Sequence, residues 1–225
     1  MVDGRDVEAV RIGPPGLEAL LGVPEDARGI VLFAHGSGSG RLSPRNNFVA
    51  AGLRQAGLAT LLLDLLTPAE ERVRANVFDI GLLASRLALA TRWVLEGPFR
   101  LRIGYFGAST GAAAALAAAS APDAQVAAVV SRGGRPDLAG KALRSVRAPT
   151  LLIVGSLDVP VIGLNREAYE ELGCEKELVI VSGAGHLFEE PGTLDQVVRH
   201  ASRWFVRHLQ GPEDIRHVRS QPDLR

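Results

Sequence analysis

Short apolar segments alternate with longer segments of helical periodicity along this chain. Segments this short and this apolar are typical of strands buried on both faces, and such strands form parallel sheets. We predict six of them, at residues 29–35, 59–64, 101–107, 126–131, 149–155 and 177–181. One or two further short strands are expected within the first 28 residues, at an edge of the sheet.

Apolar residues at helical spacing mark the segments between these strands. The predicted helices cover residues 46–56, 73–96, 110–120 and 194–209. In the last of them Val197 and Phe205 fall on one side, and Arg199 and Arg203 fall on the other. Alternation of strands and helices predicts an α/β fold, a mostly parallel, doubly wound sheet flanked by helices.

The length of the chain indicates the number of domains, and its net charge limits the classes of binding partner. A chain of 225 residues suits a single domain, which we place at residues 1–210, followed by a polar C-terminal tail at 211–225 with two prolines. Lys+Arg and Asp+Glu both number 25, so the formal net charge is zero. This balance gives no reason to expect a nucleic-acid or membrane partner. A homodimer is left open.

The chain has one cysteine, Cys174, so it can form no intramolecular disulfide. No partner ligands surround Cys174, and we therefore expect neither a metal site there nor any cofactor. The N-terminus has neither a basic region nor an apolar region of a secretory signal, and no apolar run reaches transmembrane length. A cytoplasmic location is the expectation.

The strand predicted at 101–107 leads into Gly107-Ala108-Ser109-Thr110-Gly111, and an alanine-rich helix follows. This is a G-x-S-x-G sequence in the strand–turn–helix setting that the motif needs. A side chain at the tip of so tight a turn requires neighbours without bulk, which Gly107 and Gly111 provide. The turn exposes the Ser109 hydroxyl at a helix N-terminus, where the N–H of Thr110 can stabilise an oxyanion. The alternative is a turn that only connects a strand to a helix.

A serine hydroxyl is a poor nucleophile without a base, and His186 is the candidate. It lies in the loop after the last predicted strand, where catalytic groups of open α/β sheets gather. His200 and His208 fall on the last predicted helix, and His217 falls in the tail. A loop histidine without catalytic function is the alternative.

Asp158 is the candidate for the acid of the site. It follows the fifth predicted strand, 49 residues after Ser109 and 28 before His186. Its carboxylate would accept the Nδ1 proton of His186 and so fix the tautomer that lets Nε2 take the serine proton. A turn or helix-start residue is the alternative interpretation. The competing acids are Asp64, Asp123 and Asp137.

A glycine-rich loop, His35-Gly36-Ser37-Gly38-Ser39-Gly40, follows the first buried strand. Glycines let a backbone turn inward and direct N–H groups at a site. We predict that the N–H of Ser37 joins that of Thr110 in an oxyanion hole, and that His35 braces the loop. A dinucleotide-binding loop does not fit, because Arg41 occupies the last glycine position, and no Gly-Lys-Ser/Thr follows to make a phosphate loop.

Taken in order, the HGSGSG loop, the GASTG elbow, the GSLD turn and the GAGH loop resemble the α/β-hydrolase superfamily over about residues 28–209. The short length and the lack of a long insertion resemble its dienelactone-hydrolase-like branch. The resemblance implies an α/β-hydrolase fold without a large lid, and the order serine, acid, histidine, which disfavours Asp64 as the acid. Dienelactone hydrolases carry cysteine at the elbow, whereas this chain has Ser109, which favours general carboxylic ester hydrolysis.

Residues near the predicted site suggest which chemical groups the substrate contains. Arg45, Arg132 and Arg135 fall at the carboxyl edge of the sheet, where they could grip a carboxylate or phosphate or instead pair with acids to brace loops. Phe188 could wall an acyl pocket or simply pack. Residues 65–72 leave no room for a lid domain, and an open site favours small soluble esters.

The sequence therefore predicts a serine esterase that cleaves small carboxylic esters, lactones or thioesters through an acyl-enzyme on Ser109. Its partner is a small-molecule ester substrate. An acyltransferase or a small peptidase with the same three residues is an alternative, as is a non-catalytic binding protein on a hydrolase fold.

Overall fold

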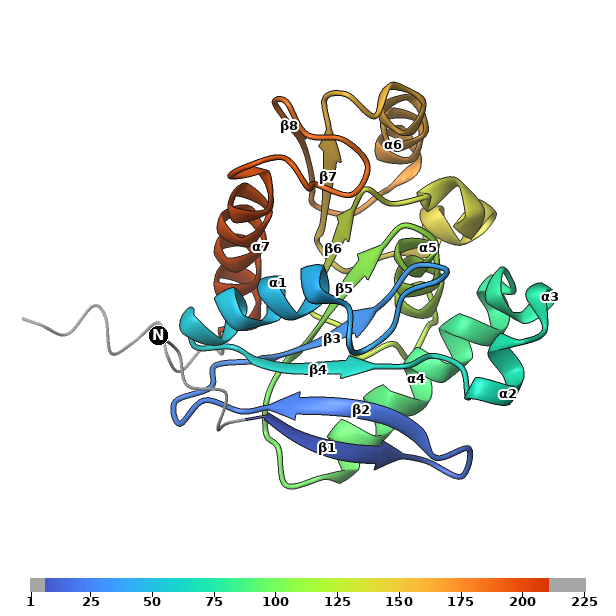
Figure 1. Cartoon of the computed structure of the whole chain (residues 1–225), viewed down its shortest axis with the longest axis vertical. Coiled ribbons are helices and arrows are strands. Elements are labelled where there is room, and N and C mark those ends of the chain that lie inside the picture. The colour runs from blue at the N-terminus through green and yellow to red at the C-terminus, as the bar shows by residue number, and fades with distance from the viewer. Residues whose placement is uncertain (1–6, 211–225) are drawn as a thin grey trace, which may run out of the picture.

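The computed structural model describes residues 7–210, which form one eight-stranded sheet with helices on both faces (Figure 1). The order of the strands across the sheet is β1-β2-β4-β3-β5-β6-β7-β8. The predicted tail at 211–225 lies outside the described residues. The strands are β1 (Val7–Ile12), β2 (Leu17–Gly22), β3 (Ile30–Ala34), β4 (Ala59–Leu63), β5 (Ile103–Ala108), β6 (Ala128–Arg132), β7 (Thr150–Gly155) and β8 (Lys176–Val181).

Strands β3 to β8 all run in the same direction, whereas β1 and β2 form an antiparallel hairpin at the edge next to β4. The six predicted parallel strands and the edge strands are thus present, which confirms the predicted fold class. Five of the six are buried as predicted, whereas β8 lies at the edge of the sheet and is mostly half-buried or exposed. Because the carboxyl ends of parallel strands meet at one edge, the loops that follow them lie together. Every candidate site residue follows or ends one of these parallel strands.

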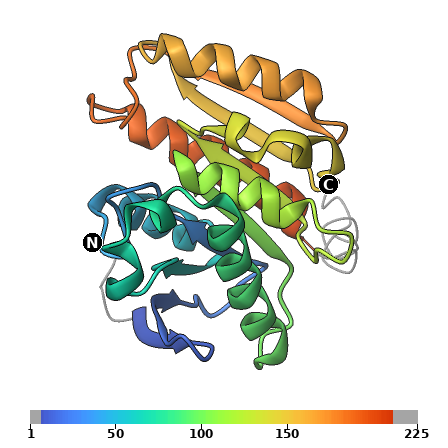
Figure 2. The ribbon, with the colours of Figure 1, turned by 90° about the vertical axis from the view of Figure 1, so that its right-hand side faces the viewer.

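The helices cover the two faces of the sheet in separate groups. Helices α1 and α7 pack on one face, and α4, α5 and α6 pack on the other, the side that Figure 2 views. Single-turn helices and a 3₁₀ segment, η2, fill the connections. The bounds are α1 (Pro44–Gln55), α2 (Pro68–Glu71), α3 (Arg74–Val77), α4 (Ile80–Glu96), α5 (Thr110–Ala119), η2 (Pro136–Ser145), α6 (Val159–Glu171) and α7 (Thr193–Leu209).

Two helical predictions differ from the structure. The segment 73–96 is not one helix: it divides into α3 and α4 at Asp79, whose side chain accepts a hydrogen bond from the Leu82 N–H at 2.9 Å. Such a cap starts a new helix within a continuous apolar pattern. Helix α6 was not predicted, because its buried residues are only Val161, Asn165 and Ala168 and leave little periodic signal.

Helix α5 positions the elbow through its small side chains. Ala112, Ala113, Ala114 and Ala115 are completely buried between the sheet and α4. Alanine side chains allow the helix axis to approach the strands closely. The start of α5 therefore packs close to the end of β5, with Ser109 alone between them. The position of residue 109 is therefore set by the packed core.

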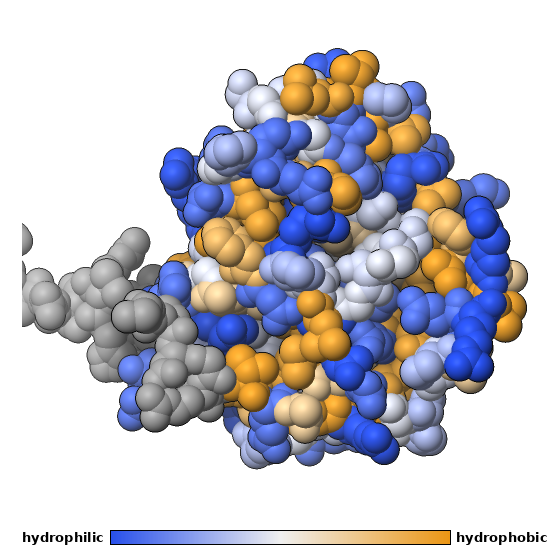
Figure 3. Space-filling view, in the orientation of Figure 1, coloured by the Kyte–Doolittle hydropathy of each residue, from blue (hydrophilic) through white to orange (hydrophobic). Residues whose placement is uncertain are grey.

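None of the described helices combines the length and the apolar character that crossing a membrane requires. On the face shown in Figure 3, hydrophilic and hydrophobic residues are interspersed. The expected cytoplasmic location stays a prediction.

Candidate active site

Ser109 occupies the turn between β5 and α5 in a conformation that side chains rarely adopt. Its φ is 51° and its ψ is −122°, and Phe188 is the only other described non-glycine residue with positive φ. A residue held in this region costs about 1–3 kcal/mol and persists only where the surroundings enforce it. The strain is therefore stored at the predicted nucleophile.

The two glycines of the elbow are sterically required. A Cβ on Gly107 would lie 2.4 Å from the Cα of Ala112, and one on Gly111 would lie 2.1 Å from the carbonyl oxygen of Ala34. Both clashes are with backbone, which cannot rotate away. The turn can thus be this tight only with glycine at both positions.

His186 and Asp158 meet at the carboxyl ends of β8 and β7. The imidazole Nδ1 lies 2.7 Å from Asp158 Oδ2, a hydrogen-bond distance. The Asp158 side chain is 12% exposed and that of His186 is 39% exposed, so the carboxylate is largely shielded while the ring is open to an approaching molecule. With Nδ1 engaged, Nε2 is the nitrogen left for chemistry.

Backbone contacts hold the two loops together. The Leu157 N–H donates to the carbonyl of Ala184 at 2.9 Å, and the Gly183 N–H donates to Ser156 Oγ at 2.9 Å. A Cβ on Gly155 would lie 2.2 Å from that same Ala184 oxygen, so the loops are in close contact. These contacts bring Asp158 and His186 together although they are 28 residues apart.

Glu190 is a contributor that the sequence analysis missed. Its Oε2 accepts a hydrogen bond from the N–H of Gly185 at 3.0 Å, immediately before His186. This backbone hydrogen bond lowers the pKa of Glu190. The only signal in the sequence is an acid close to the histidine, which is too common a pattern to identify a brace.

Ser109 and His186 each lie against residues at the end of β6. The Ser109 N–H donates to the carbonyl of Arg132 at 3.3 Å, and a Cβ on Gly133 would lie 3.6 Å from His186 Nδ1. Among the described residues no hydrogen bond joins the Ser109 hydroxyl to His186. Catalytic hydrogen bonds of this kind are often long in a free enzyme and tighten when substrate binds.

The glycine-rich loop after β3 contacts the elbow directly. A Cβ on Gly36 would lie 2.9 Å from the Cβ of Ser109, so only glycine allows this approach. The Ser37 N–H donates to the Thr110 hydroxyl oxygen at 3.1 Å. The N–H of Thr110 belongs to the first turn of α5, whose donors have no partners within the helix.

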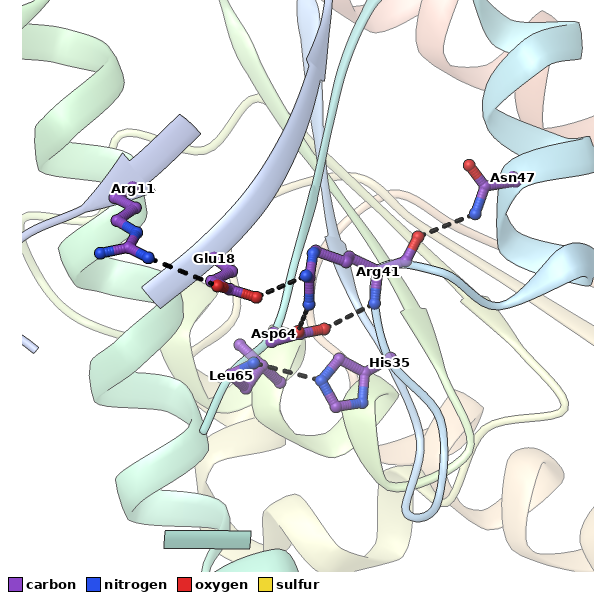
Figure 4. Close-up of polar contacts among 7 residues, drawn as sticks. All are labelled: Arg11, Glu18, His35, Arg41, Asn47, Asp64 and Leu65. Carbon is purple, nitrogen blue, oxygen red and sulfur yellow. Dashed lines mark hydrogen bonds and ion pairs between the residues drawn. The ribbon is translucent and has the colours of Figure 1, made fainter. Parts of the chain in front are cut away.

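A polar network anchors the glycine-rich loop to β4 (Figure 4). The N–H of Leu65 donates to His35 Nε2 at 3.1 Å, so His35 Nδ1 carries the proton and donates to the Gly36 carbonyl at 2.9 Å. Asp64 accepts from the Arg41 N–H at 2.6 Å and also pairs with its guanidinium. His35 and Asp64 thus hold this loop, and Asp64 does not contact His186.

A cleft of about 440 Å³ runs along this loop. Residues 38–45 line it, together with His35, Asp64, Leu66 and Glu71. The short helices α2 and α3 follow β4, so no lid domain is inserted after this strand.

The three candidate arginines differ in their surroundings. Arg45 pairs with Glu189 at 2.7 Å, and Arg135 makes two hydrogen bonds to Asp137, at 2.9 and 2.7 Å. Hydrogen bonding of the Arg135 guanidinium to the Asp137 carboxylate raises the pKa of Arg135. The charges of these two arginines are therefore matched by carboxylates.

Arg132 has no such partner among the described residues. Arg132 is 7% exposed. One guanidinium nitrogen donates to the Leu187 carbonyl at 3.4 Å, and the guanidinium carbon lies 5.8 Å from the centre of the Phe188 ring. The Nε atom is buried and has no hydrogen bond. Burial, and secondarily the charge of Arg45, lowers the pKa of Arg132 to about 10. It is still a cation at neutral pH.

Phe188 does not line an open pocket. It is 2% exposed and belongs to the core beneath α1 and α7, with a positive φ of 56°. Its neighbour Leu187 is 41% exposed and is the residue of the pair that a substrate can reach. The buried ring of Phe188 fixes the loop that carries His186.

Comparison with known proteins identifies the family. No family model matches the chain. The crystal structure of a dienelactone hydrolase from Anabaena variabilis is 57% identical and superimposes with a TM-score of 0.87, over 91% of this chain and 97% of that one. The chain belongs to the dienelactone-hydrolase-like branch of the α/β-hydrolase superfamily.

More distant structural neighbours share the fold alone. The Est1E protein from Butyrivibrio proteoclasticus has 15% identity and a TM-score of 0.76, covering 89% of this chain and 98% of that one. The esterase domain of a Rhodothermus marinus protein has 20% identity and a TM-score of 0.73, covering 90% and 98%.

A longer relative carries a different name. A Mycobacterium tuberculosis protein named "Putative phosphoribosyl transferase" is 60% identical over 211 residues, which are 92% of this chain and 48% of that protein. The chain thus spans about half the length of the mycobacterial relatives it matches.

Proposed function

We propose that the chain is a serine-dependent carboxylic ester hydrolase, with Ser109 as nucleophile, His186 as base and Asp158 as the acid that orients it. The observation that carries the proposal is the strained backbone of Ser109, next to the carboxyl edge where Asp158 and His186 are hydrogen-bonded. Strain of this kind is not needed to connect a strand to a helix, but it exposes a hydroxyl at a helix N-terminus.

The reaction follows from the roles of these three residues. Ser109 Oγ attacks the ester carbonyl while His186 Nε2 takes its proton, and Asp158 stabilises the imidazolium that forms. His186 returns the proton to the leaving alcohol, and the acyl group remains on Ser109. A water molecule then attacks the acyl-enzyme while His186 takes its proton. His186 passes this proton to Ser109 Oγ as the bond to the acyl group breaks, which releases the carboxylic acid and restores the free enzyme.

For the substrate, we propose an ester that carries a carboxylate. Arg132 supports this, because a buried guanidinium without a carboxylate partner is stabilised when an anion approaches. The charges of Arg45 and Arg135 are already matched, so they serve mainly to brace their loops. Leu187 offers an apolar contact beside His186.

Replacement of Arg132 by Met tests the substrate class. Loss of a charged hydrogen bond costs about 1.5–3 kcal/mol, so KM for a carboxylate-bearing ester should rise by about 10- to 100-fold. KM for a neutral ester of the same size should stay within about threefold. Arg135→Met is the matched control and should change neither value by more than about threefold, and equal effects of R132M on both esters would refute the carboxylate contact.

Phosphoribosyl transfer is not proposed for this site. The mycobacterial relatives extend well beyond the segment that they share with this chain, and the shared segment has a hydrolase-family fold. We propose that the activity in their name belongs to the part outside the shared segment.

A fluorophosphonate probe and short p-nitrophenyl esters test the main proposal. Wild type should be labelled and should hydrolyse esters, whereas Ser109→Ala should do neither. Failure of the wild type to react with either reagent would favour a binding protein. Turnover only with added amine or alcohol acceptors would favour an acyltransferase, and cleavage of peptides in preference to esters would favour a peptidase.

A further inference from the structure

The Thr110 hydroxyl lies at the point where the two loops of the predicted oxyanion hole meet. Its oxygen accepts the hydrogen bond from the Ser37 N–H at 3.1 Å, across 73 residues of sequence. Thr110 is 5% exposed, and its own N–H begins α5 directly after Ser109. The Ser37 N–H, predicted as the second oxyanion donor, is therefore occupied by this hydroxyl.

The proton of the Thr110 hydroxyl has no acceptor among the described residues. Three of the four other buried threonines in the described part of the chain donate theirs to backbone carbonyls: Thr91 to Leu87 at 3.0 Å, Thr150 to Ala148 at 3.0 Å and Thr193 to Glu190 at 2.7 Å. The fourth, Thr60 in β4, only accepts, from Arg54 at 2.9 Å. The residues before Thr110 are the end of β5 and the strained turn at Ser109, and none of their carbonyls accepts its proton. A buried hydroxyl that accepts one hydrogen bond and donates none has a donor available for a ligand.

We propose that the Thr110 hydroxyl itself donates a hydrogen bond to the oxyanion, which is the former carbonyl oxygen of the substrate bound to Ser109. In this arrangement the Ser37 N–H donates to Thr110 Oγ1, and the Thr110 O–H donates to the oxyanion. The inference rests on the esterase function proposed above. No proton is transferred from Thr110: the hydroxyl only donates a hydrogen bond, which strengthens as negative charge develops on the former carbonyl oxygen. The bond from Ser37 polarises the hydroxyl and makes it a better donor.

Thr110→Val tests this, because it replaces the hydroxyl by a methyl group of similar size. Removal of one oxyanion donor costs about 10²- to 10³-fold in kcat. We expect a loss of about 10²-fold in kcat on p-nitrophenyl esters, with KM within about threefold of wild type. Thr110→Ser keeps the hydroxyl and should retain kcat within about fivefold.

The competing interpretation is that the Thr110 hydroxyl only binds the Ser37 N–H and so prevents it from donating to the oxyanion. Loss of the hydroxyl would then free that N–H, and kcat of Thr110→Val would be unchanged or higher. Either result in an enzyme whose labelling depends on Ser109 would overturn the inference and leave the esterase proposal intact. An inactive, unlabelled wild type would instead overturn both.

A transition-state analogue separates a catalytic donor from a structural contact. A trifluoromethyl ketone forms an oxyanion adduct with a serine enzyme, and its affinity should fall in Thr110→Val by the same factor as kcat/KM. Thr110→Ala serves as a second variant if the valine variant is unstable by thermal denaturation. An unchanged ketone affinity in a folded variant would contradict the proposal.

Discussion

The elbow at Ser109 and the loop at His186 lie at the same edge of the sheet, yet different forces hold them. The elbow is enforced by excluded volume: Gly107 and Gly111 leave no room for a Cβ, and the conformation of Ser109 follows. The His186 loop is held by a hydrogen bond that the Gly185 N–H donates to Glu190, by hydrogen bonds with the turn after β7, and by the buried ring of Phe188.

This difference predicts different responses to substitution. Backbone atoms cannot rotate away from an added Cβ as a side chain can, so a single methyl group at Gly107 or Gly111 should strongly destabilise the fold. A loop held by several separate contacts should lose one of them with a small change in stability. The chemistry that we propose for the loop, in contrast, depends on the single hydrogen bond between Asp158 and His186.

The largest expected effect is on catalysis, from Asp158→Asn. The amide cannot hold the required tautomer of His186, and in serine enzymes this change costs about 10⁴-fold in kcat. The thermal midpoint should change little, because the side chain keeps its size. Steady-state kinetics on a p-nitrophenyl ester measure the loss, and turnover within tenfold of wild type would remove Asp158 from its proposed role.

The next effect is on stability, from Gly111→Ala. The new Cβ would meet the Ala34 carbonyl oxygen at 2.1 Å, and we expect the free energy of unfolding to fall by about 3 kcal/mol or more. Gly163→Ala is the control, since nothing lies within 4 Å of its Cβ position in α6, and it should be neutral or slightly stabilising. Urea denaturation compares the two, and similar midpoints would refute the steric account of the elbow.

A smaller effect distinguishes two inactive variants of the nucleophile. Ser109→Gly should be more stable than Ser109→Ala by about 1 kcal/mol, since glycine adopts positive φ without strain whereas alanine does not. Both variants lack the hydroxyl, so differential scanning calorimetry compares backbone strain alone. An alanine variant as stable as the glycine variant would mean that the elbow stores no strain at residue 109.

The smallest effect concerns the brace of the His186 loop. The hydrogen bond from the Gly185 N–H lowers the pKa of Glu190 in the folded protein below its ordinary value of 4.5. A depressed folded-state pKa adds stability above pH 4.5, and that stability is lost as the pH falls through the folded value. Glu190→Gln should therefore lower the thermal midpoint slightly at pH 7 and less at pH 3.5. An equal difference at the two pH values would argue against the ionised hydrogen bond.

Sequence alone predicted the parts of the fold that short-range patterns encode. The six parallel strands, the presence of edge strands near the N-terminus and α5 follow from apolar runs and alanine content, although β8 is an edge strand and not a buried one. The elbow was recognised from its glycine spacing, but only the demand on Gly107 is local, since a Cβ there would meet Ala112. The demand on Gly111 comes from the distant carbonyl of Ala34 and is visible only in the tertiary structure. The division at Asp79 and the helix α6 were missed, since a cap and a weakly buried face leave little periodic signal.

Contacts between distant segments were decided only by the tertiary structure. The sequence contained candidates for the site, but it could not show which arginines pair with acids. Among the described residues Arg45 and Arg135 do, and Arg132 does not. Nor could it show that Phe188 is buried or that the Thr110 hydroxyl accepts a hydrogen bond from the Ser37 N–H. The physical reason is range: backbone sterics and periodicity act over a few residues, whereas the partner of a side chain is chosen by which strands the sheet places side by side.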